Sequence, residues 1–195
     1  MTPNLLAHYK DKAIPALRDQ LGLKNVNEVP KIEKIVVTSH IGHFQTERKA
    51  AADDASDEIS KITGQKPSIV FAKKSVANFK VREGEPVGAR VTLRGTRMWE
   101  FLDRFIHITA PNIRDFRGFP VKSFDGRGNY AVGIADHSIF PEIELDKIKR
   151  AIGFDIIIVT SARTDEHGRK LLELMDFPFR KPQTEESQQP AAANA

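Results

Sequence analysis

The chain has 195 residues, of which 40% are hydrophobic and none is cysteine, and its formal net charge is +4. This length and apolar content favour one packed domain over a disordered chain, and the missing cysteines exclude disulfides and thiolate zinc sites. The longest apolar runs have only the length of a strand, and the N-terminus lacks the features of a signal peptide, so we expect a cytoplasmic protein without a membrane segment.

The first third of the chain predicts two helices with a strand between them. Residues 4–21 carry apolar side chains at helical spacing, and Pro15 predicts a kink or a break because proline lacks the backbone donor. Residues 31–38 alternate with a period of two and predict a strand. Residues 46–63 predict a helix with an acidic solvent face that ends at Gly64.

The middle of the chain predicts a strand, a hairpin and a strongly amphipathic helix. The strand covers residues 67–73. The hairpin has one strand over 78–82, a turn over 83–86 and a second strand over 87–95. The helix covers residues 96–109.

The last third predicts two strands and a helix after a long connection. A strand over 130–134 is followed by a strand over 154–160, whose continuous apolar run predicts burial on both faces. A helix over 165–175 comes last, and residues 182–195 are of low complexity and expected to be disordered. The irregular order of helices and strands indicates one α+β domain over residues 1–181 rather than regular βαβ winding.

Basic side chains are concentrated in the middle of the chain. Residues 73–127 hold 12 basic and 6 acidic side chains, whereas residues 1–72 hold 10 and 9, and residues 128–195 hold 8 and 11. This uneven distribution indicates that one surface meets a polyanion. The alternative, basic residues spread over a solvated surface, stays open on charge alone.

No motif for catalysis or cofactor binding fits the sequence. The glycines between residues 118 and 133 match neither the phosphate-binding loop nor the dinucleotide-binding fingerprint. His40 and His43 could share a metal but have no third ligand nearby, and Ser39 lies in no nucleophile elbow. We therefore expect no enzyme, no cofactor and no metal, and keep an enzyme acting on nucleotides or RNA as an alternative.

Residues 72–82 combine cations with small polar side chains. Hydroxyl and amide groups beside lysine and arginine are common partners of phosphate oxygens in nucleic acids. The groups concerned are Lys73, Lys74, Ser75, Asn78, Lys80 and Arg82. This composition predicts a phosphate-binding segment at the end of a strand.

The predicted strand that contains RVTLR has two unlike faces. Alternation puts Arg90, Thr92 and Arg94 on one face. Val91 and Leu93 then lie on the other, apolar face. A sheet face with guanidinium and hydroxyl groups suits the shallow minor groove of RNA, although a face turned to water is the alternative.

Residues 112–133 hold both cations and aromatic rings. The rings could stack on bases or form a small core beneath the loop, and we favour the core because long loops need internal packing. The arginines are then the part that contacts other molecules. The rings are Phe116, Phe119, Phe124 and Tyr130, and the cations are Arg114, Arg117, Lys122 and Arg127.

Longer strings carry a resemblance to a known family. They are GQKPSIVFAKKSVANFKVREGEPVGARVTLRGTRMWEFLDR, IRDFRGFPVKSFDGRGNYAVGI, FPEI and DFPFRKP. Over about residues 3–181 the chain resembles the bacterial family of large-subunit ribosomal protein five. The resemblance implies a single two-layer α+β domain with a mostly antiparallel, concave sheet packed against helices. It also implies a structural ribosomal component that attaches 5S rRNA to the central protuberance and is not a homo-oligomer.

The resemblance implies three groups of site residues. The sheet face against 5S rRNA would include Thr38, where the family has asparagine, together with Gln65, Arg90, Thr92 and Arg94. The loop that reaches P-site tRNA would carry Lys73, Lys74, Ser75, Asn78 and Lys80. The intersubunit bridge to small-subunit protein thirteen would use Arg114, Asp115, Arg117, Glu142 and Glu144.

Further partners implied by the resemblance are 23S rRNA and other proteins of the central protuberance. A free-standing RNA-binding regulator is the alternative within the class of binding proteins. Such a regulator would bind other RNAs as tightly as 5S rRNA and would not need to sediment with large subunits.

Overall fold

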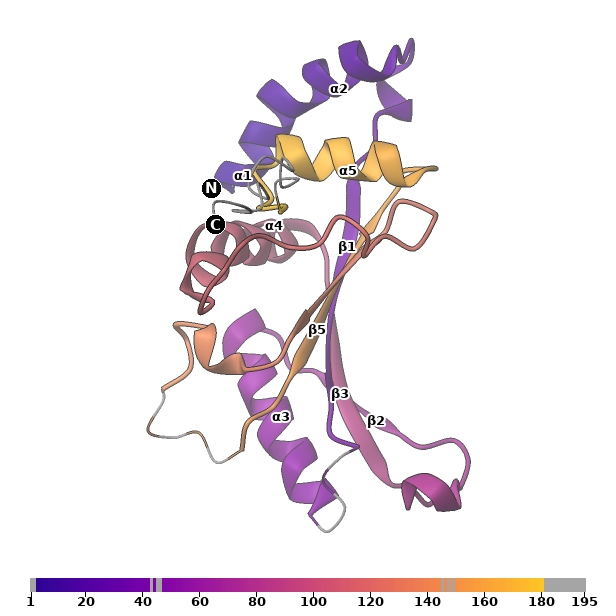
Figure 1. The fold of residues 1–195 in the computed structure, drawn as a ribbon, viewed down its shortest axis with the longest axis vertical. Coiled ribbons are helices and arrows are strands. Elements are labelled where there is room, and N and C mark those ends of the chain that lie inside the picture. The colour runs from indigo at the N-terminus through magenta and orange to yellow at the C-terminus, as the bar shows by residue number, and fades with distance from the viewer. Residues whose placement is uncertain are drawn as a thin grey trace, which may run out of the picture.

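The computed structural model describes residues 3–42, 44, 47–144, 146, 148 and 150–180. Five antiparallel strands form one open sheet in the order β2-β3-β1-β5-β4, and helices cover one side of it (Figure 1). This is the expected α+β class. The strands are β1 Ile32–His40, β2 Ser68–Phe71, β3 Pro86–Leu93, β4 Tyr130–Ile134 and β5 Phe154–Thr160.

The α-helices lie where the sequence predicts them. They are α1 Asn4–His8, α2 Ile14–Leu21, α3 Arg48–Thr63, α4 Gly95–Arg104 and α5 Asp165–Leu174. Short 3-10 turns occupy Val26–Glu28, Ala77–Phe79, Ala110–Asn112 and His137–Ile139. Within the described ranges, no helix has the length and apolar character needed to cross a bilayer. The tail 182–195 lies outside the described residues.

Two helices contain a wider π turn. The interruption expected at Pro15 takes the form of a π turn over Tyr9–Ala13, which joins α1 to α2 without a break in the helix. The backbone N–H of Ile14 donates to the carbonyl of Tyr9, five residues earlier. The helix predicted over 96–109 likewise changes from α4 to a π turn over its last five residues.

The core lies between the sheet and the helices. Alternate residues of the central strands point toward the helices and are almost fully buried, as the period of a strand requires. On the helix side they meet buried residues such as Ile59, Leu102 and Leu171. The buried strand residues include Ile35, Val37, Val91, Leu93, Tyr130, Val132, Ile156 and Ile158.

Two local predictions were wrong. Residues 78–82 form no strand, because a 3-10 turn and the left-handed backbone of Lys80, with φ of 51°, leave only an isolated bridge between Val76 and Val81. Strand β5 is not buried on both faces: its burial alternates, and Ile157 is only half-buried. The helices cover only one face of the sheet, so no second layer buries the other side of the apolar run in β5.

The aromatic rings of the long connection pack together, as the favoured alternative predicted. Phe119 and Tyr130 are 7% and 0% exposed, and their rings contact Phe177 at 5.4 and 5.3 Å between centroids. The Tyr130 hydroxyl donates to the carbonyl of Pro120 at 2.7 Å, and burial raises the pKa of Tyr130 to about 12. These rings are therefore structural and are not free to stack on bases.

Gly168 explains how α5 meets the loop of Arg127. A Cβ at Gly168 would lie 2.6 Å from the carbonyl oxygen of Gly128, so only glycine allows this approach. At the start of the same helix, Asp165 accepts hydrogen bonds from the backbone N–H groups of Gly126 and Gly128, at 3.1 and 2.8 Å. The helix thus fixes the loop that carries Arg127.

Candidate nucleic-acid interface

The sheet face away from the helices, called the open face below, carries one row of largely polar residues. Strand pairing places Ser68, Arg90, Thr38, Asp155 and Gly133 side by side across all five strands. Because neighbouring residues of a strand point to opposite faces, the buried residues between them fill the core. The next row on the same face, Thr92, Val36, Ile157 and Ala131, is mostly apolar, so the open face is a stiff, mixed surface whose positions are set by the hydrogen-bonded ladder.

The residues expected to bind 5S rRNA come together on or beside this face. Thr38 lies opposite Arg90 in the pairing of β1 with β3, and Thr92 is the next residue on the same face. Gln65, in the turn after α3, donates from Nε2 to the carbonyl oxygen of Thr92 at 3.4 Å. Arg94 follows the end of β3, is exposed, and occupies the residue before the start of α4.

The alternation predicted for β3 is confirmed. Val91 and Leu93 are 3% and 0% exposed, whereas Arg90 is exposed and Thr92 half-buried. The guanidinium group therefore projects from the open face while its neighbours anchor the strand in the core.

Sequence inspection missed a histidine–carboxylate pair on the open face. His40 Nδ1 lies 3.0 Å from Asp155 Oδ2, with the two side chains 70% and 49% exposed. The pair joins β1 to β5, which are more than a hundred residues apart in the chain, so no local pattern indicates it. His43 lies outside the described residues. Among the residues that are described, no three histidine, cysteine or acidic side chains are grouped to hold a metal ion.

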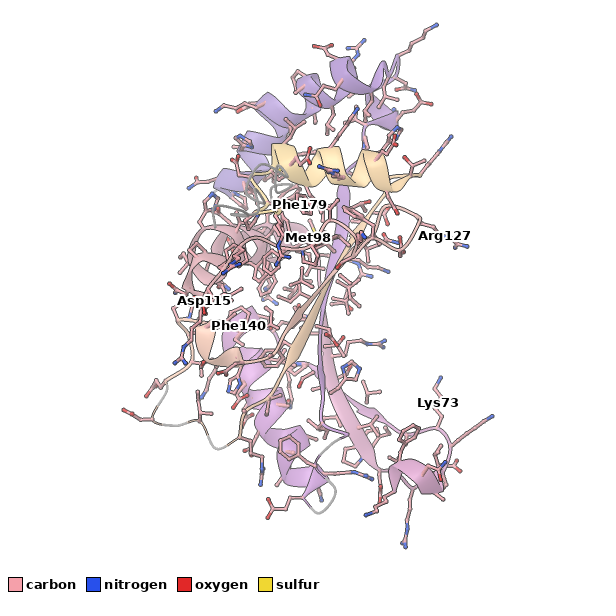
Figure 2. All side chains as sticks on the ribbon, viewed as in Figure 1. Lys73, Met98, Asp115, Arg127, Phe140 and Phe179 are labelled. Carbon is pink, nitrogen blue, oxygen red and sulfur yellow. The ribbon has the colours of Figure 1, made fainter. Side chains whose placement is uncertain are left out.

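The connection between β2 and β3 forms an exposed cationic loop, which we name the hairpin loop and define as residues 72–85. Lys73 projects from it at one end of the molecule (Figure 2). All residues from Lys73 to Lys80 are exposed, and the Phe79 ring is 72% exposed. The Ser75 hydroxyl accepts from the backbone N–H of Glu83 at 2.9 Å, which closes the loop.

The residues expected at the intersubunit bridge lie elsewhere. Asp115 is on the other side of the sheet from Lys73 and Arg127 (Figure 2). Arg114 and Arg117 are exposed beside it and line a hollow of about 800 Å³ that also includes Asp136 and Arg180.

The two glutamates of the expected bridge already have contacts within the chain. Glu142 Oε1 lies 2.9 Å from Arg104 Nε, and its side chain is only 25% exposed. Glu144 also takes part in an interaction. Arg114, Asp115 and Arg117 are exposed, as is Glu144, so Glu142 is the least accessible residue of this group.

The chain matches two descriptions of one protein family. Residues 25–82 match ribosomal protein L5, and residues 86–179 match the ribosomal L5P family C-terminus. This family is that of a structural ribosomal component and not of an enzyme.

Curated relatives named large ribosomal subunit protein uL5 agree with the family over most of the chain. The protein from Natranaerobius thermophilus is 51% identical over 90% of this chain and 97% of its own length. Those from Clostridium botulinum and Alkaliphilus oremlandii are 51% and 54% identical, over 92% and 89% of this chain and 99% and 96% of theirs. The chain therefore belongs to the uL5 family of bacterial large-subunit ribosomal proteins.

Proposed function

We propose that this protein is a constituent of the large ribosomal subunit in the bacterial cytoplasm and that its open face binds 5S rRNA. The observation that carries the proposal is the alignment of Arg90, Thr38 and Thr92 on a helix-free sheet face, backed by a dry core. Membership of the uL5 family supports the ribosomal location. We expect the protein to join 5S rRNA to the central protuberance. Its neighbours there would be 23S rRNA and other proteins of that region.

Binding combines charge neutralisation with recognition of backbone shape. Arg90 and Arg94 neutralise phosphates, which releases counterions and makes affinity depend on salt. Hydroxyls such as that of Thr92 reach phosphate oxygens or ribose 2′-hydroxyl groups, which a wide minor groove exposes. The Gln65 amide, held beside Thr92, adds a donor and an acceptor in a fixed place.

The hairpin loop is the proposed contact with P-site tRNA. It lies at the end of the molecule where α3 begins, and Lys73 projects outward from it (Figure 2), so a second RNA can approach there without displacing the first. Its exposed cations include Lys73, Lys74 and Lys80, with Ser75 and Asn78 between them. They would bind the sugar–phosphate backbone and therefore act independently of tRNA sequence.

The third contact is an intersubunit bridge to small-subunit protein thirteen. Arg114, Asp115 and Arg117, before β4, supply exposed charges of both signs, and Glu142 and Glu144 lie in the next connection, between β4 and β5. A site built from mixed charges suits a protein partner better than an RNA surface. No second copy of this chain is required for any of the three contacts.

The assignment of the open face is tested by measuring 5S rRNA affinity of the full-length protein at several salt concentrations. We expect Thr92→Ala to lose about fivefold, the equivalent of one hydrogen bond of about 1 kcal/mol. We expect Arg90→Gln to weaken binding and to reduce the slope of affinity against salt by about one.

Arg97→Gln is the matched control, because Arg97 is also exposed but lies on α4. It should leave both affinity and slope unchanged. Normal affinity in Arg90→Gln and Thr92→Ala together would remove the open face from the RNA contact. Co-sedimentation with large subunits separates a ribosomal constituent from a free-standing regulator.

A further inference from the structure

A buried arginine connects the hairpin loop to α3. Arg48, the first residue of that helix, is only 6% exposed. Its Nε donates to the carbonyl oxygen of Phe44 at 3.2 Å, one terminal nitrogen donates to that of Phe79 at 3.2 Å, and the other pairs with the Glu85 carboxylate. Each nitrogen of the guanidinium group thus binds a different residue.

The contacts divide the hairpin loop into a closed base and a held tip. At the base, the Ala72 N–H donates to the Glu85 carbonyl and the Gly84 N–H donates to the Ala72 carbonyl. The Glu85 carboxylate also accepts from the backbone N–H of Arg82 at 3.0 Å. At the tip, the Phe79 carbonyl reaches back to Arg48 although the Phe79 ring is exposed. Arg48 therefore contacts both parts from one buried position.

The contact with Phe79 lies beside a strained residue. Lys80 has φ of 51°, a left-handed backbone conformation that costs energy for any residue with a Cβ. Because Phe79 and Lys80 share a peptide bond, the hydrogen bond from Arg48 fixes the orientation of that peptide group. A buried guanidinium that loses a partner must stay desolvated and unpaired, which opposes movement of the loop.

We propose that Arg48 is a positioning residue that holds the hairpin loop, and with it Lys73, Lys74 and Lys80, in one arrangement for binding. The role of tRNA as the partner rests on the proposed function, whereas the holding of the loop does not. Arginine is required because three separate nitrogens of one planar group bind Phe44, Phe79 and Glu85. Lysine can supply only one nitrogen.

The charge state of Glu85 agrees with this role. The backbone N–H of Arg82 and the nearby Arg48 guanidinium lower the pKa of Glu85 below its usual 4.5. Because the pKa of Glu85 is lowered in the folded protein, its ion pair with Arg48 is complete above pH 4.5. The pair weakens only as the pH falls through the lowered pKa. The loop is thus held throughout the neutral range.

Limited trypsin digestion of the full-length protein tests the holding directly, because Lys73, Lys74, Lys80 and Arg82 are all cleavage sites. We expect Arg48→Gln to raise the rate of cleavage in the loop about tenfold, since proteolysis follows local opening. Arg48→Lys should give an intermediate rate. Amide hydrogen exchange over 72–85 should increase in parallel.

Arg150→Gln is the matched control. Arg150 binds Asp54 at 2.6 Å and also Glu47, at the same end of α3, and lies over the Phe44 ring. Removing it perturbs that helix end while leaving the loop contacts in place. Equal cleavage of Arg48→Gln and Arg150→Gln would overturn the proposal.

Glu85→Gln provides a second test if Arg48→Gln proves unstable, since it removes the other half of the ion pair from a half-exposed position. It should also loosen the loop, and a loop as protected as in the unsubstituted protein would overturn the proposal.

Binding of deacylated tRNA to ribosomes reassembled with each variant separates the two ideas. We expect the double variant Lys73→Gln/Lys74→Gln and Arg48→Gln both to weaken it. If the loop loosens in Arg48→Gln but neither variant changes tRNA binding, the positioning role stands and the partner is not tRNA.

Discussion

His137 and His40 each face a carboxylate, on opposite sides of the sheet. His137 has no exposed surface, and its Nε2 lies 3.3 Å from Oε2 of Glu58, which is itself 12% exposed. His40 and Asp155 are closer, at 3.0 Å, but are largely in water. The comparison teaches that distance alone does not set the energy of an ion pair, because water screens the exposed pair and not the buried one.

The buried surroundings of His137 affect its pKa and its contribution to stability. Its Nδ1 lies 3.0 Å from the carbonyl oxygen of Ile152, and its ring meets that of Phe154 edge to face. Nε2 and the nearest oxygen of Glu58 have no well-aligned hydrogen bond despite their short separation. Burial lowers the pKa of His137, but the Glu58 carboxylate, the Ile152 backbone and the Asp136 carboxylate together outweigh it and raise the pKa above 6.5.

The largest expected effect is on stability when each histidine is removed. His137→Ala should lower the free energy of unfolding by about 2–4 kcal/mol, because it leaves a cavity and an uncompensated carboxylate at Glu58. His40→Ala, the matched control, should change it by less than about 0.5 kcal/mol. Urea denaturation at pH 6 measures both. Equal losses would contradict the distinction between a buried and an exposed pair.

The pH dependence of stability sharpens the comparison. Since the folded pKa of His137 is raised, its contribution is complete below about pH 6.5, the unfolded value, and is lost as the pH rises through the higher folded value. His137→Gln should therefore show a flatter fall in unfolding free energy above pH 6.5 than the unsubstituted protein. Parallel curves would show that His137 does not gain a proton on folding.

The smallest expected effect concerns RNA binding. Asp155 places a negative charge in the row that contains Arg90 and Thr38. Asp155→Asn should strengthen 5S rRNA binding by about threefold at low salt, less than 1 kcal/mol, and the gain should vanish at high salt. Glu33→Gln, a change of one exposed acid on the same strand as Thr38, is the control. Weaker binding in Asp155→Asn would instead mean that Asp155 orients His40 for a contact with RNA.

Much of the fold was predictable because its signals are local. The alternation in RVTLR identified the two faces of β3, and Gly64 ends α3 in the left-handed conformation expected of it, with φ of 65°. Family membership supports the predicted ribosomal protein. The site assignments and the domain limit at residue 181 stay predictions.

What could not be predicted depends on contacts between distant segments. Arg48 is separated from Glu85 by 37 residues, and its burial gives no signal in a helix start rich in charge. The His40–Asp155 pair likewise depends on the register of β1 with β5. The false strand at 78–82 had the right residue types, but a left-handed Lys80 overrode them.

The contact between Gly168 and Gly128 has a consequence for synthesis. Two backbone N–H groups in the loop of Arg127 donate to Asp165, and the backbone of Phe119 pairs with residues 178 and 180. A nascent chain cannot complete this surface until α5 has left the ribosomal tunnel. The segment from α5 to residue 180, which is translated after the loop, therefore determines when the Arg127 region reaches its final shape.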